Sequence, residues 1–230
     1  MHIILIVIAV ILVFALLYGP QYWTRQVLEK HSIQQDHFPG TGGELAEHLI
    51  ETLGLQDIKV EKSDSGDHYD PLKRTVRLTQ DKLEGKSLTA ITVAAHEVGH
   101  AIQHQMGYTP FKIRHYLGIV AFGAQKLGAL LMVLIPVLGL ITRSPQVGLV
   151  IFLLGVASMA LSTVVHLVTL PVEWDASFKR ALPILQAGGY ISSNEHKDAK
   201  RILTAAALTY VSGSLASLLN LARWLAILRR

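Results

Sequence analysis

The 230-residue chain contains no cysteine. This absence excludes disulfide bonds, zinc sites built from thiolates and catalysis by a cysteine nucleophile, and it carries no information on the cellular compartment. Any metal ion bound by the chain must therefore have nitrogen and oxygen ligands.

Charged residues are scarce as well. They make up 17% of the chain, whereas an average soluble domain has about 25%, and the mean hydropathy of +0.38 is high. The formal net charge is +4, but the Lys and Arg residues form no stripe interleaved with aromatic side chains, as a nucleic-acid interface would require. We therefore expect no nucleic-acid partner and interpret the basic residues as flanks of membrane-spanning segments.

The apolar residues are concentrated in four stretches, at 3–17, 127–142, 147–170 and 203–228. The first stretch is barely long enough to cross a hydrocarbon core of about 30 Å, but the aromatic residues that follow it suit a membrane interface. A cleaved signal peptide fits less well, because no basic residues precede the stretch and no small-x-small cleavage site follows it. The distribution predicts a mainly α-helical integral membrane protein with three or four transmembrane helices in the lipid bilayer.

The polar region after the first stretch changes its pattern several times. Thr41 and Glu44 have the spacing of a capping box, and runs near 58–60 and 76–78 alternate apolar and polar residues, which is typical of strands. The patterns predict, in order, an irregular segment at 24–40, a helix from Thr41 to Gly54, short antiparallel strands at 58–60 and 76–78, a helix at 87–106 and an interfacial helix at 111–126.

Residues 127–170 are predicted to form a transmembrane hairpin with a short turn at 142–146. A hairpin returns the chain to the side that it left, so the segments before and after it face the same compartment. Lys and Arg number 11 in residues 24–115 and five in 171–202, against Arg143 alone in the turn. By the positive-inside rule, the shared side is the cytoplasmic face of a multi-pass protein of the cell membrane.

The motif His-Glu-Val-Gly-His at 96–100 carries the strongest chemical signal. His96 and His100 lie four residues apart on one face of a helix, so both rings can direct a nitrogen at one metal ion at about 2.0–2.1 Å. Glu97 lies beside them, where it can take a proton from an attacking water and pass it to the leaving amine. This is the HExxH pattern of zinc metalloproteases. Its neighbours are small or apolar, and burying three ionisable groups without a function would be costly.

A catalytic zinc ion keeps three protein ligands and one open position, so a third ligand is needed. The pattern HExxHxxGxxH is excluded, because Gln103 and Met106 occupy the positions of its Gly and its last His. His104 would lie about 6 Å further along the helix axis than His100, and we expect it to pack or to hydrogen-bond a ligand. His166 lies in an apolar run and is more consistent with a buried histidine.

Glu173 is the better candidate. Pro171 is typical of a helix start, which would place Glu173 in the first turn, directly after the hairpin and on the correct side of the membrane. Asp175 could then hydrogen-bond a ligating histidine. The alternative for Glu173 is a carboxylate that only stabilises a helix N-terminus. A further helix is predicted near Ser192, which has capping-box spacing to Glu195.

Four ordered segments carry a more specific signal: DHYDPLKRTVRLT, AITVAAHEVGHAIQHQMGYTP, VTLPVEWDASFKRAL and AAALTYVSGSL. From about residue 40 to the C-terminus the chain resembles the YugP-like family of bacterial neutral zinc metallopeptidases and, more distantly, HtpX-type membrane proteases. The resemblance implies a gluzincin, in which His96, His100 and Glu173 hold one zinc ion and Glu97 is the general base. Trp174 stands where the family commonly has Phe, a departure that leaves the ligand unaffected.

Two further features of these segments suggest contacts with substrate. Tyr210 could donate a hydrogen bond to the oxyanion of the tetrahedral intermediate, although an aromatic residue at the membrane interface is an equally good interpretation. In zincin folds the edge strand before the catalytic helix pairs with extended substrate, so Val76–Leu78 would line the cleft. His68 and Tyr69 could instead simply stabilise the strand.

The sequence thus predicts a membrane-embedded zinc endopeptidase with a small α+β zincin-like (gluzincin) catalytic domain that the hairpin splits in two. The predicted divisions are an anchor at 1–23, the first part of the catalytic domain at 24–126, the hairpin at 127–170, the second part at 171–202 and a hydrophobic helix at 203–230, either transmembrane or packed on the cleft. Peptides or proteins are the expected substrates, with membrane proteins as candidates, and the oligomeric state stays open. The alternative is a non-proteolytic, metal-stabilised membrane scaffold or chaperone-like partner, against which Glu97 argues, since a structural site needs no base.

Overall fold

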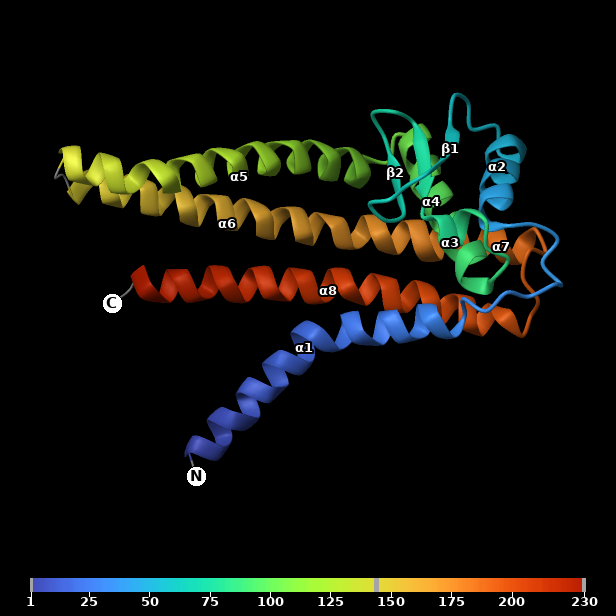
Figure 1. Ribbon diagram of the computed structural model, residues 1–230, viewed down its shortest axis with the longest axis horizontal. Helices are drawn as coiled ribbons and strands as arrows, with labels where there is room; N and C mark the ends of the chain where they lie inside the picture. Colours follow the sequence, from blue (N-terminus) through green and yellow to red (C-terminus); the bar gives the residue numbers. More distant parts are fainter. Residues whose placement is uncertain (1, 143–144, 229–230) are drawn as a thin grey trace.

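The structure is a computed structural model that describes residues 2–142 and 145–228, with many residues in 2–10, 125–159 and 220–228 described by their backbone alone. Four long helices run alongside one another and carry a small α+β domain at one end (Figure 1). The long helices are α1 (His2–Lys30), α5 (Thr109–Thr142), α6 (Pro145–Trp174) and α8 (Glu195–Leu228). Helix α6 packs between α5 and α8, and α8 also packs against α1.

Helix α1 bends about midway, and its N-terminal half diverges from α8 (Figure 1). Pro20 lies inside this helix, and a proline in a helix interior removes a backbone hydrogen bond and kinks the helix. Beyond it, the Thr24 hydroxyl lies 2.6 Å from the carbonyl oxygen of Ala205 in α8. Because this packing supports further helical turns, α1 continues to Lys30, and the prediction of an irregular segment is wrong for residues 24–30.

The α+β domain is built around α4 (Leu88–Gln105), most of whose residues are buried. The side chain of Ser87 accepts a hydrogen bond from the first turn of α4 and caps it. Helix α2 (Gly42–Thr52) begins at the predicted capping box: the Thr41 hydroxyl accepts from the backbone N–H of Glu44, and the Glu44 carboxylate accepts from that of Thr41. The predictions of these two helices are confirmed.

A three-stranded sheet packs against α4. Its strands are β1 (Lys59–Lys62), β2 (His68–Asp70) and β3 (Thr75–Leu78), in the order β1-β3-β2, and the short helix α3 (Gln80–Leu83) follows them. Strand β1 pairs in parallel with β3, whereas β2 pairs antiparallel with it. The predicted antiparallel pairing of 58–60 with 76–78 is therefore wrong, because β2 lies between them in the sequence and reverses the chain once more.

Strand β3 is the central strand of this sheet and not an edge strand. The side chains of Val76 and Leu78 are fully buried in the core of the domain. The prediction that Val76–Leu78 line the cleft is consequently wrong: with a neighbour on each side, β3 has no free edge for a peptide.

Helices α5 and α6 form a helical hairpin (Figure 1). Helix α5 is continuous, so the predicted interfacial helix at 111–126 is not separated from the stretch that follows it. The predicted turn at 142–146 includes residues 143 and 144, which lie outside the described residues. The structure therefore does not place Arg143, the basic residue of this turn.

The prediction that Pro171 begins a helix is wrong, because this residue lies inside α6. After Trp174 the chain passes without a break into a π-helical segment, η1 (Asp175–Ala181), and then into α7 (Leu182–Ala187). The Pro171 side chain is exposed, while Val172 and Glu173 are buried in the domain. Tertiary packing on both sides of the proline thus overrides its tendency to interrupt a helix.

Helix α8 begins at the predicted capping box: the backbone N–H and the hydroxyl of Ser192 donate to the Glu195 carboxylate at 2.8 and 2.7 Å. Among the helices that the structure describes, Glu195–Leu219 is the one stretch that is long and apolar enough to cross a membrane. Only 33% of its most apolar window is buried, and most of the remaining residues are partly exposed. The sequence predicted three or four transmembrane helices, whereas the described residues contain one candidate span.

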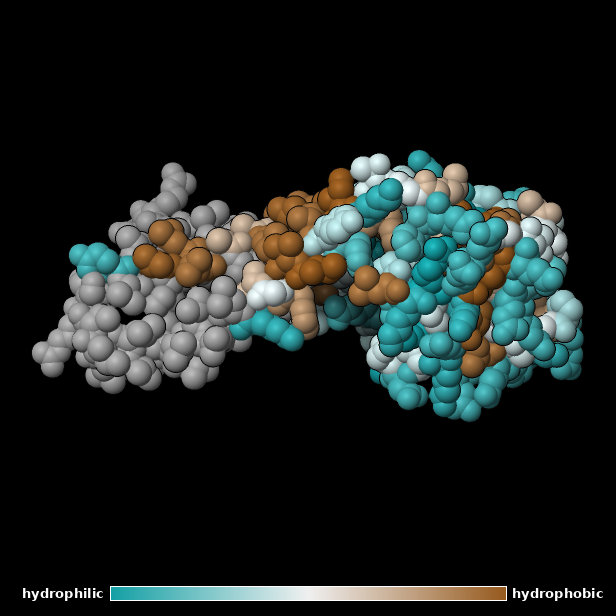
Figure 2. Space-filling model, turned by 90° about the horizontal axis from the view of Figure 1, so that it is seen from above, coloured by the Kyte–Doolittle hydropathy of each residue, from teal (hydrophilic) through white to brown (hydrophobic). Residues whose placement is uncertain are grey.

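The surface changes character along the molecule (Figure 2). Hydrophilic residues cover the α+β domain, and hydrophobic residues gather on the adjoining part of the long helices. The exposed hydrophobic side chains of α5 next to the domain are Ile113, Tyr116, Ile119, Val120 and Phe122. This hydrophobic band lies directly next to the α+β domain.

Candidate metal centre

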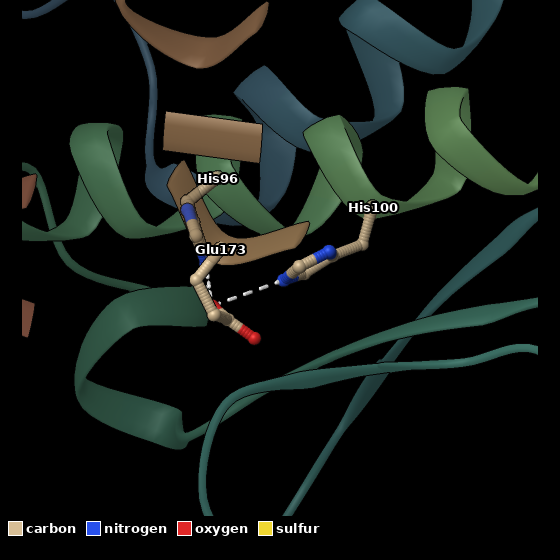
Figure 3. Close-up of side chains that lie close together, drawn as sticks. All are labelled: His96, His100 and Glu173. Atoms are coloured by element: carbon tan, nitrogen blue, oxygen red, sulfur yellow. Dashed lines mark hydrogen bonds and ion pairs between the residues drawn. The ribbon is translucent and has the colours of Figure 1, made fainter. Parts of the chain in front are cut away.

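Helix α4 and the end of α6 together bring three potential ligands to one point. His96 and His100, one turn apart on α4, have their ring centroids 4.7 Å apart. Glu173 approaches them from α6, with its Oε2 3.2 Å from Nε2 of His96 and 3.4 Å from Nε2 of His100 (Figure 3). The three ligand atoms lie within 4.8 Å of one another, so they could hold one metal ion.

Glu173 is ionised although its side chain is only 2% exposed. Burial alone would raise the pKa of this carboxyl group, but the charge and hydrogen bonds of His100 and His96 outweigh burial and hold the pKa well below its usual range. A buried carboxylate of this kind needs a cation in front of it.

The tautomer of His100 follows from its contact with Gln103, whose side chain is completely buried. The Gln103 amide nitrogen donates to the carbonyl oxygen of Val172 and to the Asp175 carboxylate, both at 2.8 Å. Its Oε1 therefore faces Nδ1 of His100 at 2.9 Å, and this Nδ1 must carry the proton. With its proton on Nδ1, His100 can offer the lone pair of Nε2 to a cation placed between this atom and Oε2 of Glu173, which lies 3.4 Å away.

The π-helical segment η1 supports the site from behind. The Ser177 hydroxyl lies 3.1 Å from Nδ1 of His96, and Asp175 accepts a further hydrogen bond from Arg180 at 2.7 Å. Asp175, which we expected to contact a ligating histidine directly, reaches His100 through Gln103. Such partners fix the orientation of metal ligands, and single π-helical turns occur frequently at functional sites.

Close packing of α4 against η1 depends on Gly99. A Cβ atom at this position would lie 2.9 Å from the carbonyl oxygen of Ala176, which is closer than side chains normally approach a backbone oxygen. The glycine inside the HExxH motif thus lets α4 approach η1, the segment that directly follows Glu173.

Glu97 is buried beside the three ligands and is 6% exposed. Burial raises its pKa to about 7; the attraction of His96 lowers this value, and the negative charges of Glu173 and Asp67 raise it. A carboxyl group that titrates near neutral pH is suited to accept and return a proton.

Two residues from other helices complete the site. Arg114 of α5 places Nη1 2.8 Å from Oε1 of Glu173, an ion pair without the geometry of a hydrogen bond. Tyr210 of α8 is close enough to interact with the Glu173 carboxylate. A cavity of about 430 Å³ opens onto the site, and its walls include Glu97, His100, Arg114, Glu173, Tyr210, His68 and Tyr69.

The structure thus brings together the three predicted ligands and places Glu97 and Tyr210 on their cavity. It places the two other histidines elsewhere. His104 is within hydrogen-bonding distance of the Tyr69 hydroxyl at 2.9 Å and stacks on Phe111. His166 lies beside Gly213, where α6 packs against α8.

The sequence did not predict three neighbours of the candidate ligands: Gln103, Arg114 and Ser177. A buried Gln one turn after His100 was a usable signal, because it lies on the ligand face of the helix. Nothing in the local sequence around Arg114 or Ser177 indicates a partner, since the contacts of both join segments more than 50 residues apart.

Comparisons with known proteins agree with this geometry. A family model described as "Putative neutral zinc metallopeptidase" matches residues 4–229. A relative from Bacillus subtilis strain 168, named "Putative membrane protease YugP", is 36% identical over 225 residues, covering 97% of this chain and 96% of the relative. No solved structure matches the chain. The resemblance predicted from the four sequence segments is confirmed.

Proposed function

The chain belongs to a family of neutral zinc metallopeptidases, and from this premise we propose that it is a membrane-embedded zinc endopeptidase with Glu97 as its general base. The observation that carries the proposal is the convergence of His96, His100 and Glu173 next to Glu97 on one cavity. Two imidazoles and one carboxylate are the ligand set of catalytic zinc sites that keep an open position.

The residues of the chain divide the work of peptide hydrolysis among them. Zinc, when bound, supplies a Lewis acid that polarises the peptide carbonyl and makes water a better nucleophile near neutral pH. Glu97 takes the proton of the attacking water and passes it to the nitrogen of the departing amine. Tyr210 lies across the cavity, where its hydroxyl can donate to the oxyanion.

Strand β2 is the best candidate for binding the substrate backbone. It forms one edge of the sheet, and its residues His68 and Tyr69 line the cavity together with Glu97. An extended peptide could add to this edge by main-chain hydrogen bonds.

We propose a multi-pass arrangement in the cell membrane with the α+β domain on the cytoplasmic side. The hydrophobic band of α5 next to the domain and the long, apolar α8, of whose most apolar window only 33% is buried, support contact with lipid. The segments on the domain side of the hairpin contain more Lys and Arg residues than its turn, which supports the cytoplasmic side. An active site next to the membrane surface suits peptides and proteins at the membrane, including membrane proteins, as substrates.

Zinc content and proteolysis, measured together, test the proposal. We expect detergent-purified wild type to hold one zinc ion per chain and to cleave casein. His96→Ala and Glu173→Ala should lose the metal, whereas Glu97→Gln should keep it and lose activity about 10²- to 10⁴-fold. Glu51→Gln, which changes an exposed carboxylate of α2, is the matched control and should behave like wild type.

Two results would contradict the proposal. Wild type without zinc would remove its basis. Zinc in wild type without cleavage of any peptide, together with loss of folding when the ligands are changed, would favour the non-proteolytic membrane scaffold.

A further inference from the structure

Arg114 has a distinctive place among the basic residues that the structure describes. It is the one Lys or Arg within this part of the chain that forms an ion pair with a predicted metal ligand, Glu173. It comes from the start of α5, whereas Glu173 comes from the end of α6, so the pair joins the two ends of the helical hairpin. The Arg114 side chain is 31% exposed and forms part of the cavity wall.

The two oxygens of Glu173 have different partners. Oε2 is directed at the Nε2 atoms of His96 and His100, while Oε1 lies 2.8 Å from the guanidinium of Arg114. Oε2 is therefore the oxygen that faces a shared metal ion, while the guanidinium of Arg114 competes with that ion for Oε1. This matters because a carboxylate can bind a metal through one oxygen or through both.

The number of oxygens decides what remains for the substrate. Two imidazoles and one carboxylate oxygen leave the fourth position of a tetrahedral site open, as catalysis requires. With both oxygens bound, the protein would supply four ligand atoms, and a water molecule could bind only as a fifth ligand.

We propose that Arg114 is a positioning residue that holds Glu173 to a single ligand oxygen and so keeps one coordination position free. This inference rests on the proposed metallopeptidase function, because it concerns the same zinc site. It assigns Arg114 a role that differs from simply neutralising a buried carboxylate.

The two roles predict different results for Arg114→Met. If Arg114 only neutralises Glu173, the variant loses thermal stability but its metal site is unchanged. If Arg114 restricts Glu173 to one oxygen, zinc binds no more weakly than in wild type, because a cation is removed from its surroundings and a ligand oxygen is gained. Catalysis nevertheless suffers, and kcat should fall about 10- to 100-fold with KM little changed.

The experiment compares wild type, Arg114→Met and Arg114→Lys in detergent, with Lys112→Met as a matched control that removes an exposed charge from the same helix. Each protein is loaded with zinc to measure affinity and casein kinetics. Each is also loaded with Co²⁺, whose visible absorption bands weaken when a four-coordinate centre becomes five-coordinate. We expect weaker bands for Arg114→Met, intermediate bands for Arg114→Lys and wild-type bands for Lys112→Met.

Wild-type bands in Arg114→Met would overturn the inference, and so would a tenfold loss of zinc affinity, which would indicate that Arg114 orients Glu173 instead of restricting it. If Arg114→Met does not fold, Arg114→Gln keeps a polar side chain of similar length and is tested by the same spectrum. Absence of zinc or of cleavage in wild type would instead contradict the proposed function, so the two failures are distinguishable.

Discussion

A single buried amide, that of Gln103, connects a metal ligand to the second half of the domain. Its oxygen receives the Nδ1 proton of His100, and its nitrogen donates to Val172 and Asp175 on either side of Glu173. One side chain thereby fixes the tautomer of one ligand and the backbone position of another. Its loss affects both at once.

Gln103→Leu is expected to weaken zinc binding about 10- to 100-fold, because His100 is no longer held in the tautomer that presents Nε2. Competition with a chelator of known affinity measures this change. Gln105→Leu is the control, since Gln105 is exposed on the same helix. Equal zinc affinity in the two variants would show that Gln103 does not orient His100.

The raised pKa of Glu97 makes the stability of the metal-free protein depend on pH. The unfolded chain releases the Glu97 proton near pH 4.5, whereas burial keeps it on the folded protein up to about pH 7. Stability from this group is complete below pH 4.5 and lost as pH rises through about 7. The loss is about 3 kcal/mol in all, at 1.36 kcal/mol for each unit of pKa.

Thermal unfolding at a fixed scan rate, with and without chelator, measures this effect as the difference between wild type and Glu97→Gln. Without metal, the melting temperature of wild type should fall relative to that of Glu97→Gln as the pH rises from 5 to 8. Added zinc should reduce the difference, because a cation stabilises the ionised carboxylate. A difference that does not change with pH would contradict a raised pKa.

At this scale, spacing alone predicted a zinc site with His96 and His100, because four residues make about one helical turn. Glu173 needed the hairpin argument and the family resemblance, since 73 residues separate it from His100. Arg114 could not be predicted as its partner: a basic residue next to an apolar stretch is equally typical of a membrane flank.

At the scale of secondary structure, the contact between α4 and η1 sets the dimensions of the site. Gly99 lies at this contact, directly between the two histidines in the sequence, and η1 follows the third ligand. The separation of these two elements therefore controls how far Glu173 lies from the imidazoles.

Gly99→Ala is expected to destabilise the protein and to weaken zinc binding, because the new methyl group meets the Ala176 carbonyl oxygen at 2.9 Å. In an open helix the same exchange stabilises by up to about 1 kcal/mol. Gly123→Ala in α5 is the control, since its Cβ would have no neighbour within 4 Å. Melting temperature and zinc affinity should fall for Gly99→Ala only; equal behaviour of the two variants would show that α4 and η1 can separate freely.

The elements themselves were partly predictable. Helices α2 and α4 were predicted because capping residues and periodicity agree there, and these signals are local. The direction of β1 was not, because parallel and antiparallel strands alternate apolar and polar residues in the same way. Pro20 and Pro171 mark no helix ends, because the residues after each proline pack against other elements: Thr24 contacts Ala205 of α8, and Val172 and Glu173 are buried in the domain.

For the whole molecule, the central question is on which side of the membrane the domain lies. The two segments on either side of the α5–α6 hairpin meet in the metal centre at one end of the molecule (Figure 1). The opposite end of the hairpin must then lie on the far side if the long helices cross the bilayer.

The absence of native cysteine allows a direct test with single introduced cysteines. Asp64→Cys labels the exposed β1–β2 connection, and Gln146→Cys labels the far end of the hairpin. In intact cells a membrane-impermeant maleimide should react with Gln146→Cys but reach Asp64→Cys only after permeabilisation. The reverse pattern would place the domain outside the cell.

Hydropathy predicted a membrane protein at this scale, because apolar segments are long and need no knowledge of their partners. It could not show how α8 packs between α1 and α6. Small residues of α8, including Gly213 beside His166, allow that approach, and their effect depends on the helix opposite.

The predicted ligands of the metal centre lie far apart in the sequence, and this separation determines when the site can form during synthesis. Ribosomes make His96 first, then Arg114 near the start of α5, and Glu173 follows only near the end of α6, after almost the whole hairpin. A chain whose synthesis has not passed the end of α6 therefore lacks the third predicted ligand. On the proposed function, such an unfinished chain cannot bind zinc through this site, so activity can begin only late in synthesis.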